Sequence, residues 1–272
     1  MKKILLFIFA FIIQATSSFS QINNRGVVAL VIGPAFPTGH FGNNNLYDES
    51  SGFAETGETI SLEYTKAFSK HWSILINLAG QRNPINTQAF ESSFSKAKIY
   101  QGFYFGSDPN NPPLQNNYKI YPNWKFDHKS WLYGTLQVGV KGQFPVDKQN
   151  KTWLTTEASI SVLYAASPQI KGSSITDTAS AIITQSKSTG FGMSYSFGGG
   201  VKYYFKKKLF FTTILKYTGS NKVTFKNVKT TLTTTHGTFG SPDYSISQSI
   251  ITTNGKQTFN SISPQLGFGI IL

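Results

Sequence analysis

The sequence contains no cysteine among its 272 residues. It therefore offers no disulfide bond and no cysteine that could carry a lipoprotein anchor. Beyond residue 13, no apolar run approaches the ~20 residues that a membrane-spanning helix needs. If the mature chain enters a membrane, we expect a closed β-barrel, because open strand edges cannot be exposed to lipid.

The sequence also lacks recognisable catalytic motifs. Its four histidines, His40, His71, His128 and His236, lie in separate predicted loops or turns without metal-ligand spacing. There is no H-E-x-x-H or G-x-S-x-G segment. We therefore predict no enzymatic activity, no metal and no cofactor. A lipid-modifying outer-membrane enzyme built from dispersed serine, histidine and acidic residues stays open as an alternative.

The first residues predict export. Lys2 and Lys3 precede an unbroken apolar run over residues 4–13, and small residues stand at Ser18 and Ser20. This order is typical of a secretory signal peptide, whereas the run is too short for an anchor helix. We predict a signal peptide over residues 1–20 and an outer-membrane β-barrel domain over residues 21–272.

The chain is basic, with 25 Lys and Arg against 12 Asp and Glu. Without Lys2 and Lys3 the formal charge is still +11. A basic balance can indicate nucleic acid, but the export signal argues against that partner. We expect outer-membrane lipid and the phosphates of lipopolysaccharide, for example at Lys222, Lys226 and Lys229. Alternatively, scattered lysines serve solubility alone.

Eight segments are predicted as strands. In all but the first, apolar and polar residues alternate, as expected for strands with one polar and one apolar face, although residues 209–217 do so less cleanly. In the last of them, Ile262, Leu266 and Phe268 share one face, and Ser261, Ser263 and Gln265 share the other. The facing of the first segment, near residues 27–33, is ambiguous because it is almost continuously apolar.

The predicted connections alternate in length. Short ones cover residues 69–71, 145–151 and 206–208, and long ones cover 34–57, 81–130, 167–189 and 219–258. This rhythm predicts a single antiparallel up-and-down transmembrane barrel of eight strands, with short periplasmic turns and long extracellular loops. Residues 97–106 and 223–235 also have strand character. They either extend barrel strands beyond the membrane or add a hairpin, which would make ten strands.

Alternation alone does not show which face points outward, because a soluble lipocalin-like barrel has its apolar face inside. Two features favour the membrane form. The polar face is small and rich in glycine, which suits a narrow lumen. Aromatic residues also cluster at the turn ends of the apolar face, as an interfacial girdle would: Phe68, Trp72, Phe144, Tyr203, Phe205 and Phe211.

Residues 33–42, Gly-Pro-Ala-Phe-Pro-Thr-Gly-His-Phe-Gly, follow the first predicted strand. They resemble the G-x-x-x-P-x-G-x-F opening of small outer-membrane β-barrel proteins of Bacteroidetes (OmpA/OmpW-like eight-stranded barrels). The Ser-Phe-Ser-Gln export site and the hairpin layout are similar to that family too. The resemblance implies insertion by the barrel-assembly machinery. Such barrels usually end in an aromatic residue, whereas this chain ends in Leu272. Either Phe268 serves as that signal, or the signal is relaxed in this chain.

Five charged residues fall on the predicted lumen face: Glu63 and Glu157, with Lys141, Lys202 and Lys216. Buried charges must pair, so we predict a lumen plugged by ion pairs and polar side chains. The alternative is a narrow porin-like path for ions or small solutes. The predicted role is structural, surface-binding or complex-forming, with an envelope protein as a possible partner. The aromatic segment over residues 81–130 either contacts sugars or proteins or packs on itself to cap the barrel.

Overall fold

The computed structural model describes residues 26–46, 48, 50–96, 123–176, 179–237 and 244–272. The predicted signal peptide lies outside these residues. The elements in chain order are β1 (Gly26–Pro37), η2 (Gly39–Gly42), β2 (Gly57–Ala67), β3 (Trp72–Asn83), α2 (Thr87–Lys96), β4 (Lys125–His128), β5 (Trp131–Pro145), β6 (Thr152–Ala166), β7 (Ile170–Ile175), β8 (Ala179–Gln185), β9 (Thr189–Tyr204), β10 (Leu209–Ser220), β11 (Val223–His236), β12 (Ser245–Gln257) and β13 (Ser261–Ile271).

Eight of the strands close into a barrel in the order β1-β13-β10-β9-β6-β5-β3-β2. Every neighbouring pair is antiparallel, and the first strand meets the last, as in the pairs Val27–Ile271 and Ile32–Leu266. Closure leaves the barrel without an open edge. The predicted fold, an all-β antiparallel barrel of eight strands, is confirmed, and the alternative of ten strands is excluded for the described residues.

The barrel is apolar outside and polar inside. On β6, Leu154, Ile160 and Val162 are about half exposed or more on the outer face, whereas Glu157 and Ser159 are buried in the lumen. The first strand differs, because its inward residues are apolar as well. Ala29 and Val31 point inward and are buried, and Leu30 and Ile32 point outward. The polarity of the barrel is the reverse of a soluble globular core.

On β2, charged residues bound the outer apolar face at both ends. Its outward positions run from Glu58 to Lys66 through Ile60, Leu62 and Tyr64. The eight residue steps between Glu58 and Lys66 span about 27 Å, or about 20 Å along the axis once a tilt of about 40° is allowed for. This height is close to the apolar band of about 25 Å in membrane barrels.

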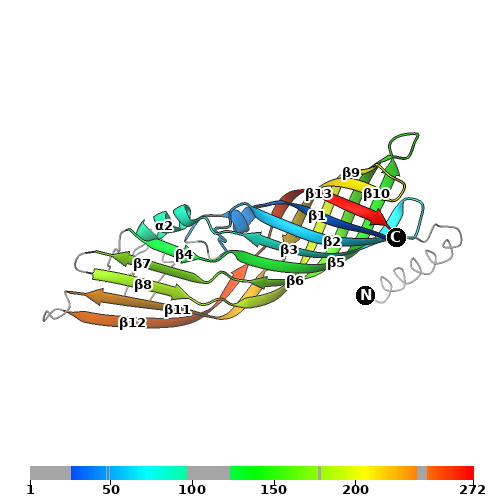
Figure 1. Ribbon diagram of the computed structural model, residues 1–272. Coiled ribbons are helices and arrows are strands. Elements are labelled where there is room, and N and C mark those ends of the chain that lie inside the picture. Colours follow the sequence, from blue (N-terminus) through cyan, green and yellow to red (C-terminus); the bar gives the residue numbers. More distant parts are fainter. Residues whose placement is uncertain (1–25, 47, 49, 97–122, 177–178, 238–243) are drawn as a thin grey trace, which may run out of the picture.

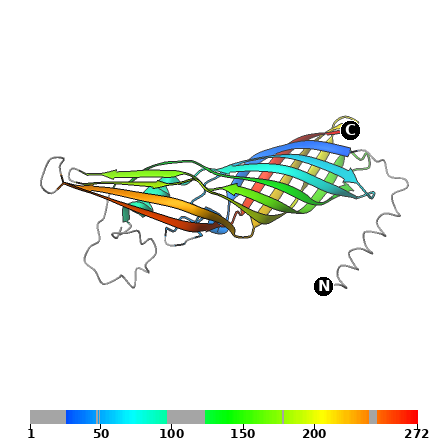
Figure 2. The ribbon, with the colours of Figure 1, turned by 90° about the horizontal axis from the view of Figure 1, so that it is seen from below.

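The long connections do not stay irregular. Three of them form a second sheet in the order β12-β11-β8-β7-β4, which extends beyond one end of the barrel (Figure 1). We call it the surface sheet. The short turns and the C-terminus lie at the opposite end, and the view from below shows the same elongated arrangement (Figure 2). Residues 223–235 belong to β11 of the surface sheet, whereas residues 97–106 lie outside the described part.

One face of the surface sheet is covered by α2. Phe90 and Phe94 of α2 pack with Phe126 of β4, at ring-centroid distances of 4.8 Å each. Ile183 of β8 and Leu232 of β11 complete this buried cluster. Among the described residues, no helix is both long and apolar enough to cross a bilayer.

Candidate functional site: the barrel lumen

Four charged side chains form a closed ring of ion pairs across the lumen, which we call the charge ring. Lys141 Nζ lies 2.7 Å from Glu63 Oε2 and 3.1 Å from Glu157 Oε2. Lys216 Nζ lies 3.5 Å from Glu63 Oε1 and 2.6 Å from Glu157 Oε1. Each of these side chains is at most 4% exposed. Opposite charges alternate around the ring, so each charge has two partners, which offsets the cost of removing it from water.

The strand register explains how the ring forms. Lys141 on β5 is directly opposite Glu157 on β6. Glu157 pairs with Gly198 on β9, and Gly198 pairs with Lys216 on β10. Gly198 has no side chain, so Lys216 can reach across β9 to Glu157. This role of Gly198 was not predicted, because it depends on which strands are neighbours.

Lys202, the fifth predicted lumen charge, stands outside the ring. Its Nζ donates a hydrogen bond of 2.7 Å to Gln143 Oε1 and lies 4.5 Å from the centre of the Phe210 ring. None of the ion pairs in the described part of the chain involves Lys202, although it is only 2% exposed. An amide oxygen and an aromatic face therefore replace the missing carboxylate.

The remaining lumen space is small. A cavity of about 20 Å³ reaches Lys216 from the side of Gln81 and Gln265. A second cavity of about 10 Å³ touches Glu63 and Lys141 from the other side. Each is about the size of one water molecule. The charge ring lies between them.

Apolar side chains close the lumen at both ends. At the end with the short turns, Phe210 packs with Ala29 and Val31, and its ring occupies the space beside Gly269. At the mouth below the surface sheet, Phe259 packs against Phe41 of η2 at 5.1 Å. The rings at the mouth, from Phe41, Trp131, Tyr133, Phe225 and Phe259, form what we call the mouth cap.

The mouth cap was not predicted. Phe41 belongs to the G-x-x-x-P-x-G-x-F segment, but Phe259 carries no sequence signal that separates it from other phenylalanines. The aromatic residues of the loop over residues 81–130 lie partly outside the described residues. Those that are described, such as Trp124 and Phe126, are buried and pack on one another at 5.5 Å.

The predicted girdle residues lie at the end of the barrel with the short turns. Trp72 contacts Phe144 at 6.0 Å, and Phe205 stacks on Phe211 at 4.8 Å. Tyr203, like these four, is exposed on the outer face, and Phe68 is half-buried in the turn after β2. Further aromatic pairs occur higher on the outer wall, Tyr164–Phe191 and Phe197–Tyr217. These were not predicted as a second girdle.

His40 and His71 lie in separate places, His40 in η2 and His71 in the short turn between β2 and β3. His40 Nδ1 lies 3.0 Å from Asp48 Oδ2, and no described hydrogen bond joins His40 to a serine hydroxyl. The backbone N–H of Ser50, together with His40 and Asn43, lowers the pKa of Asp48. His71 Nδ1 contacts the Gln143 carbonyl oxygen at 3.1 Å. In the described residues, no three His, Cys, Asp or Glu side chains are grouped to hold a metal.

Breaking the charge ring should strongly destabilise the barrel. We expect Glu157→Gln to lower the free energy of unfolding by about 3–5 kcal/mol, because it leaves buried lysine charge uncompensated. Glu58→Gln is the matched control. It removes one partner of an exposed pair with Arg82, 3.6 Å apart, and should cost about 0–1 kcal/mol. Urea unfolding in detergent micelles measures both, and equal effects would show that the ring does not stabilise the fold.

No protein-family model and no curated protein matches this chain. Similar solved structures include Neisserial surface protein A, with 10% identity, coverage of 91% of this chain and 97% of that chain, and a TM-score of 0.42. Ail, the attachment invasion locus protein of Yersinia pestis, has 10% identity, coverage of 92% of this chain and 100% of that chain, and a TM-score of 0.39. The outer membrane protein OprG of Pseudomonas aeruginosa has 11% identity, coverage of 92% of this chain and 96% of that chain, and a TM-score of 0.33. The similarity is one of barrel fold alone, and the Bacteroidetes resemblance remains a prediction.

Proposed function

We propose that this protein is an outer-membrane anchor that holds the surface sheet outside the cell and whose plugged lumen does not conduct. The proposal rests above all on the inverted polarity of the barrel. Its outer face is apolar between Glu58 and Lys66, and its inner face carries the charge ring. A soluble barrel would expose this apolar face to water, whereas lipid accepts it.

Three layers support a closed lumen: the mouth cap, the charge ring, and the apolar cluster around Phe210. An eight-stranded barrel has an interior just wide enough for side chains to fill. With cavities of about 20 and 10 Å³ beside the ring, a hydrated ion would have to separate ion pairs in order to pass.

The surface sheet supports a binding role. Within the described part of the chain, its edge strand β12 pairs with β11 on one side only, and every residue of β12 except Gln257 is exposed or half-buried. Its single charge is Lys256. A long, weakly charged edge with unpaired backbone groups can accept a strand from another protein. We therefore propose a protein partner at β12, in keeping with a complex-forming role.

Surface labelling tests the anchor. Because the chain has no cysteine, Ser247→Cys on β12 and Lys207→Cys in the turn after β9 each introduce a unique thiol. On intact cells, a membrane-impermeant maleimide should modify Ser247→Cys fully and leave Lys207→Cys unmodified. Lys207→Cys should react only after the outer membrane is permeabilised. Labelling of the turn alone on intact cells would reverse the proposed orientation.

Conductance discriminates the plug from the narrow porin-like channel. Lys202, which has no ion-pair partner among the described residues, is a feature that favours a path for anions. In planar bilayers we expect no steady unitary currents from the native protein, with a general porin as the positive control. Steady currents that Lys141→Glu alters or abolishes would overturn the plug and support the channel.

A further inference from the structure

The outer wall contains three outward-facing glycines that strand packing does not require: Gly80, Gly134 and Gly199. A Cβ atom at each would come no closer than 3.6 Å to any neighbouring atom. At the inward-facing Gly200, by contrast, a Cβ atom would collide with the backbone of β10. The three outer positions could therefore carry side chains. Since they do not, two grooves lie in the apolar face.

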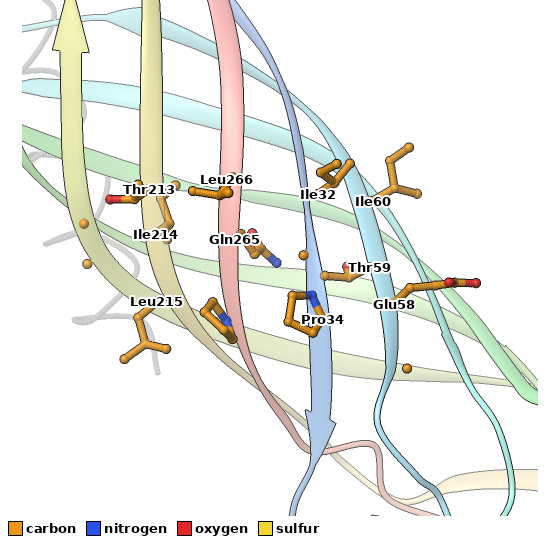
Figure 3. Close-up of a pocket in the computed structure, with 15 residues that line it drawn as sticks. Ile32, Pro34, Glu58, Thr59, Ile60, Thr213, Ile214, Leu215, Gln265 and Leu266 are labelled. Atoms are coloured by element: carbon orange, nitrogen blue, oxygen red, sulfur yellow. The ribbon is translucent and has the colours of Figure 1, made fainter.

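The first groove, which we call the seam groove, lies over Gly199 beside the junction of β1 and β13. It has a volume of about 1090 Å³ and a largely apolar lining that includes Ile32, Pro34, Ile60, Leu215 and Pro264 (Figure 3).

Strand pairing is interrupted beside the seam groove. The β1–β13 ladder stops after Ile32–Leu266 and resumes at Phe36–Ile262. The same register would place Pro34 opposite Pro264, and neither has an N–H to donate. The wall is therefore recessed at this place.

The second groove, which we call the wall groove, lies over Gly80 and Gly134. Its volume is about 410 Å³, and its apolar walls include Leu132 and Tyr164. Ile60 and Glu58 line both grooves. Ile60 therefore stands as a ridge between the seam groove and the wall groove, and Glu58 lies at the polar end that the two grooves share.

The polar end of the wall groove carries a net positive charge. Arg82 and Lys187 line the wall groove together with one carboxylate, Glu58. Arg82 Nε donates a hydrogen bond of 3.0 Å to Ser130 Oγ, which orients the guanidinium group. Its Nη1 lies 3.6 Å from Glu58 Oε1, with both side chains more than half exposed. Such an exposed pair is weak, so an anion can compete for Arg82.

We propose that these grooves bind one phosphorylated, multi-chain glycolipid of the lipid A type, taken from the outer leaflet. Its phosphate contacts Arg82 and Lys187, and its acyl chains lie in the seam groove and the wall groove on either side of Ile60. The positive charges of Arg82 and Lys187 and the two apolar grooves match one molecule with an anionic head and several apolar tails. The proposal rests on the proposed function, because the long-loop end of the barrel must face the outer leaflet.

Native mass spectrometry of the purified full-length protein in detergent tests the site with bisphosphorylated lipid A as the probe. The native protein should bind one lipid A in preference to phosphatidylglycerol. R82Q and K187Q should each weaken binding by about tenfold, the loss of one charge-assisted hydrogen bond. Glu58→Gln should strengthen binding, because it removes the competing carboxylate. Gly134→Leu should weaken binding by filling the wall groove.

Two control variants lie outside the grooves: Ala158→Leu on the outer face of β6, and Lys148→Gln in the exposed short turn after β5. Both should bind lipid A like the native protein. Equal binding of phosphatidylglycerol, or equal losses in the controls, would overturn the proposed site. Flotation of the native protein with liposomes separates the two claims. If it floats but does not select lipid A, only the lipid site fails, and if it does not float, the proposed function fails first.

Discussion

A narrow closed cylinder is the constraint on which the rest of this structure depends. Eight hydrogen-bonded strands satisfy the backbone without help from solvent, but they leave an interior only wide enough for side chains. Whatever points inward must find its partners inside. The charge ring meets this demand with two lysines and two glutamates, and Gly198 provides the space through which Lys216 reaches Glu157. The same narrowness explains why glutamine, serine and threonine fill most of the other inward positions.

The outer face follows a different constraint, because it must suit the membrane that we propose around it. Its exposed side chains are largely apolar, with charged positions at both ends of β2 and aromatic pairs near the short turns. Its recesses lie over Gly80, Gly134 and Gly199, where side chains are missing, and beside the interruption of the β1–β13 ladder. The polar groups of the lumen thus find their partners within the chain, whereas the outer wall is a grooved apolar surface of the kind that the proposed membrane anchor requires.

Much of the barrel could be predicted from the sequence, because the side-chain period of a strand is two residues and the turn lengths reveal the hairpins. The same periodicity put Glu63, Lys141 and Glu157 on one face before any pairing was known. The pairing itself could not be predicted. The separation of Lys202 from the ring depends on distances across the lumen, and the mouth cap joins Phe41 to Phe259 from opposite ends of the chain. The surface sheet was predicted only in part. Residues 223–235 showed strand character, but the pairing of strands from three separate long connections could not be read from the sequence.

The central claim is the inverted polarity, with lipid outside the barrel and ion pairs inside. Nuclear Overhauser contacts between lipid acyl-chain protons and side-chain methyl groups, measured in nanodiscs, test it most directly on β6. Leu154, Ile160 and Val162 point outward there, and Thr155 points inward. We predict acyl-chain contacts to the three outward residues and none to Thr155. Water contacts along Ile160 and Val162, or acyl-chain contacts to Thr155, would contradict the account.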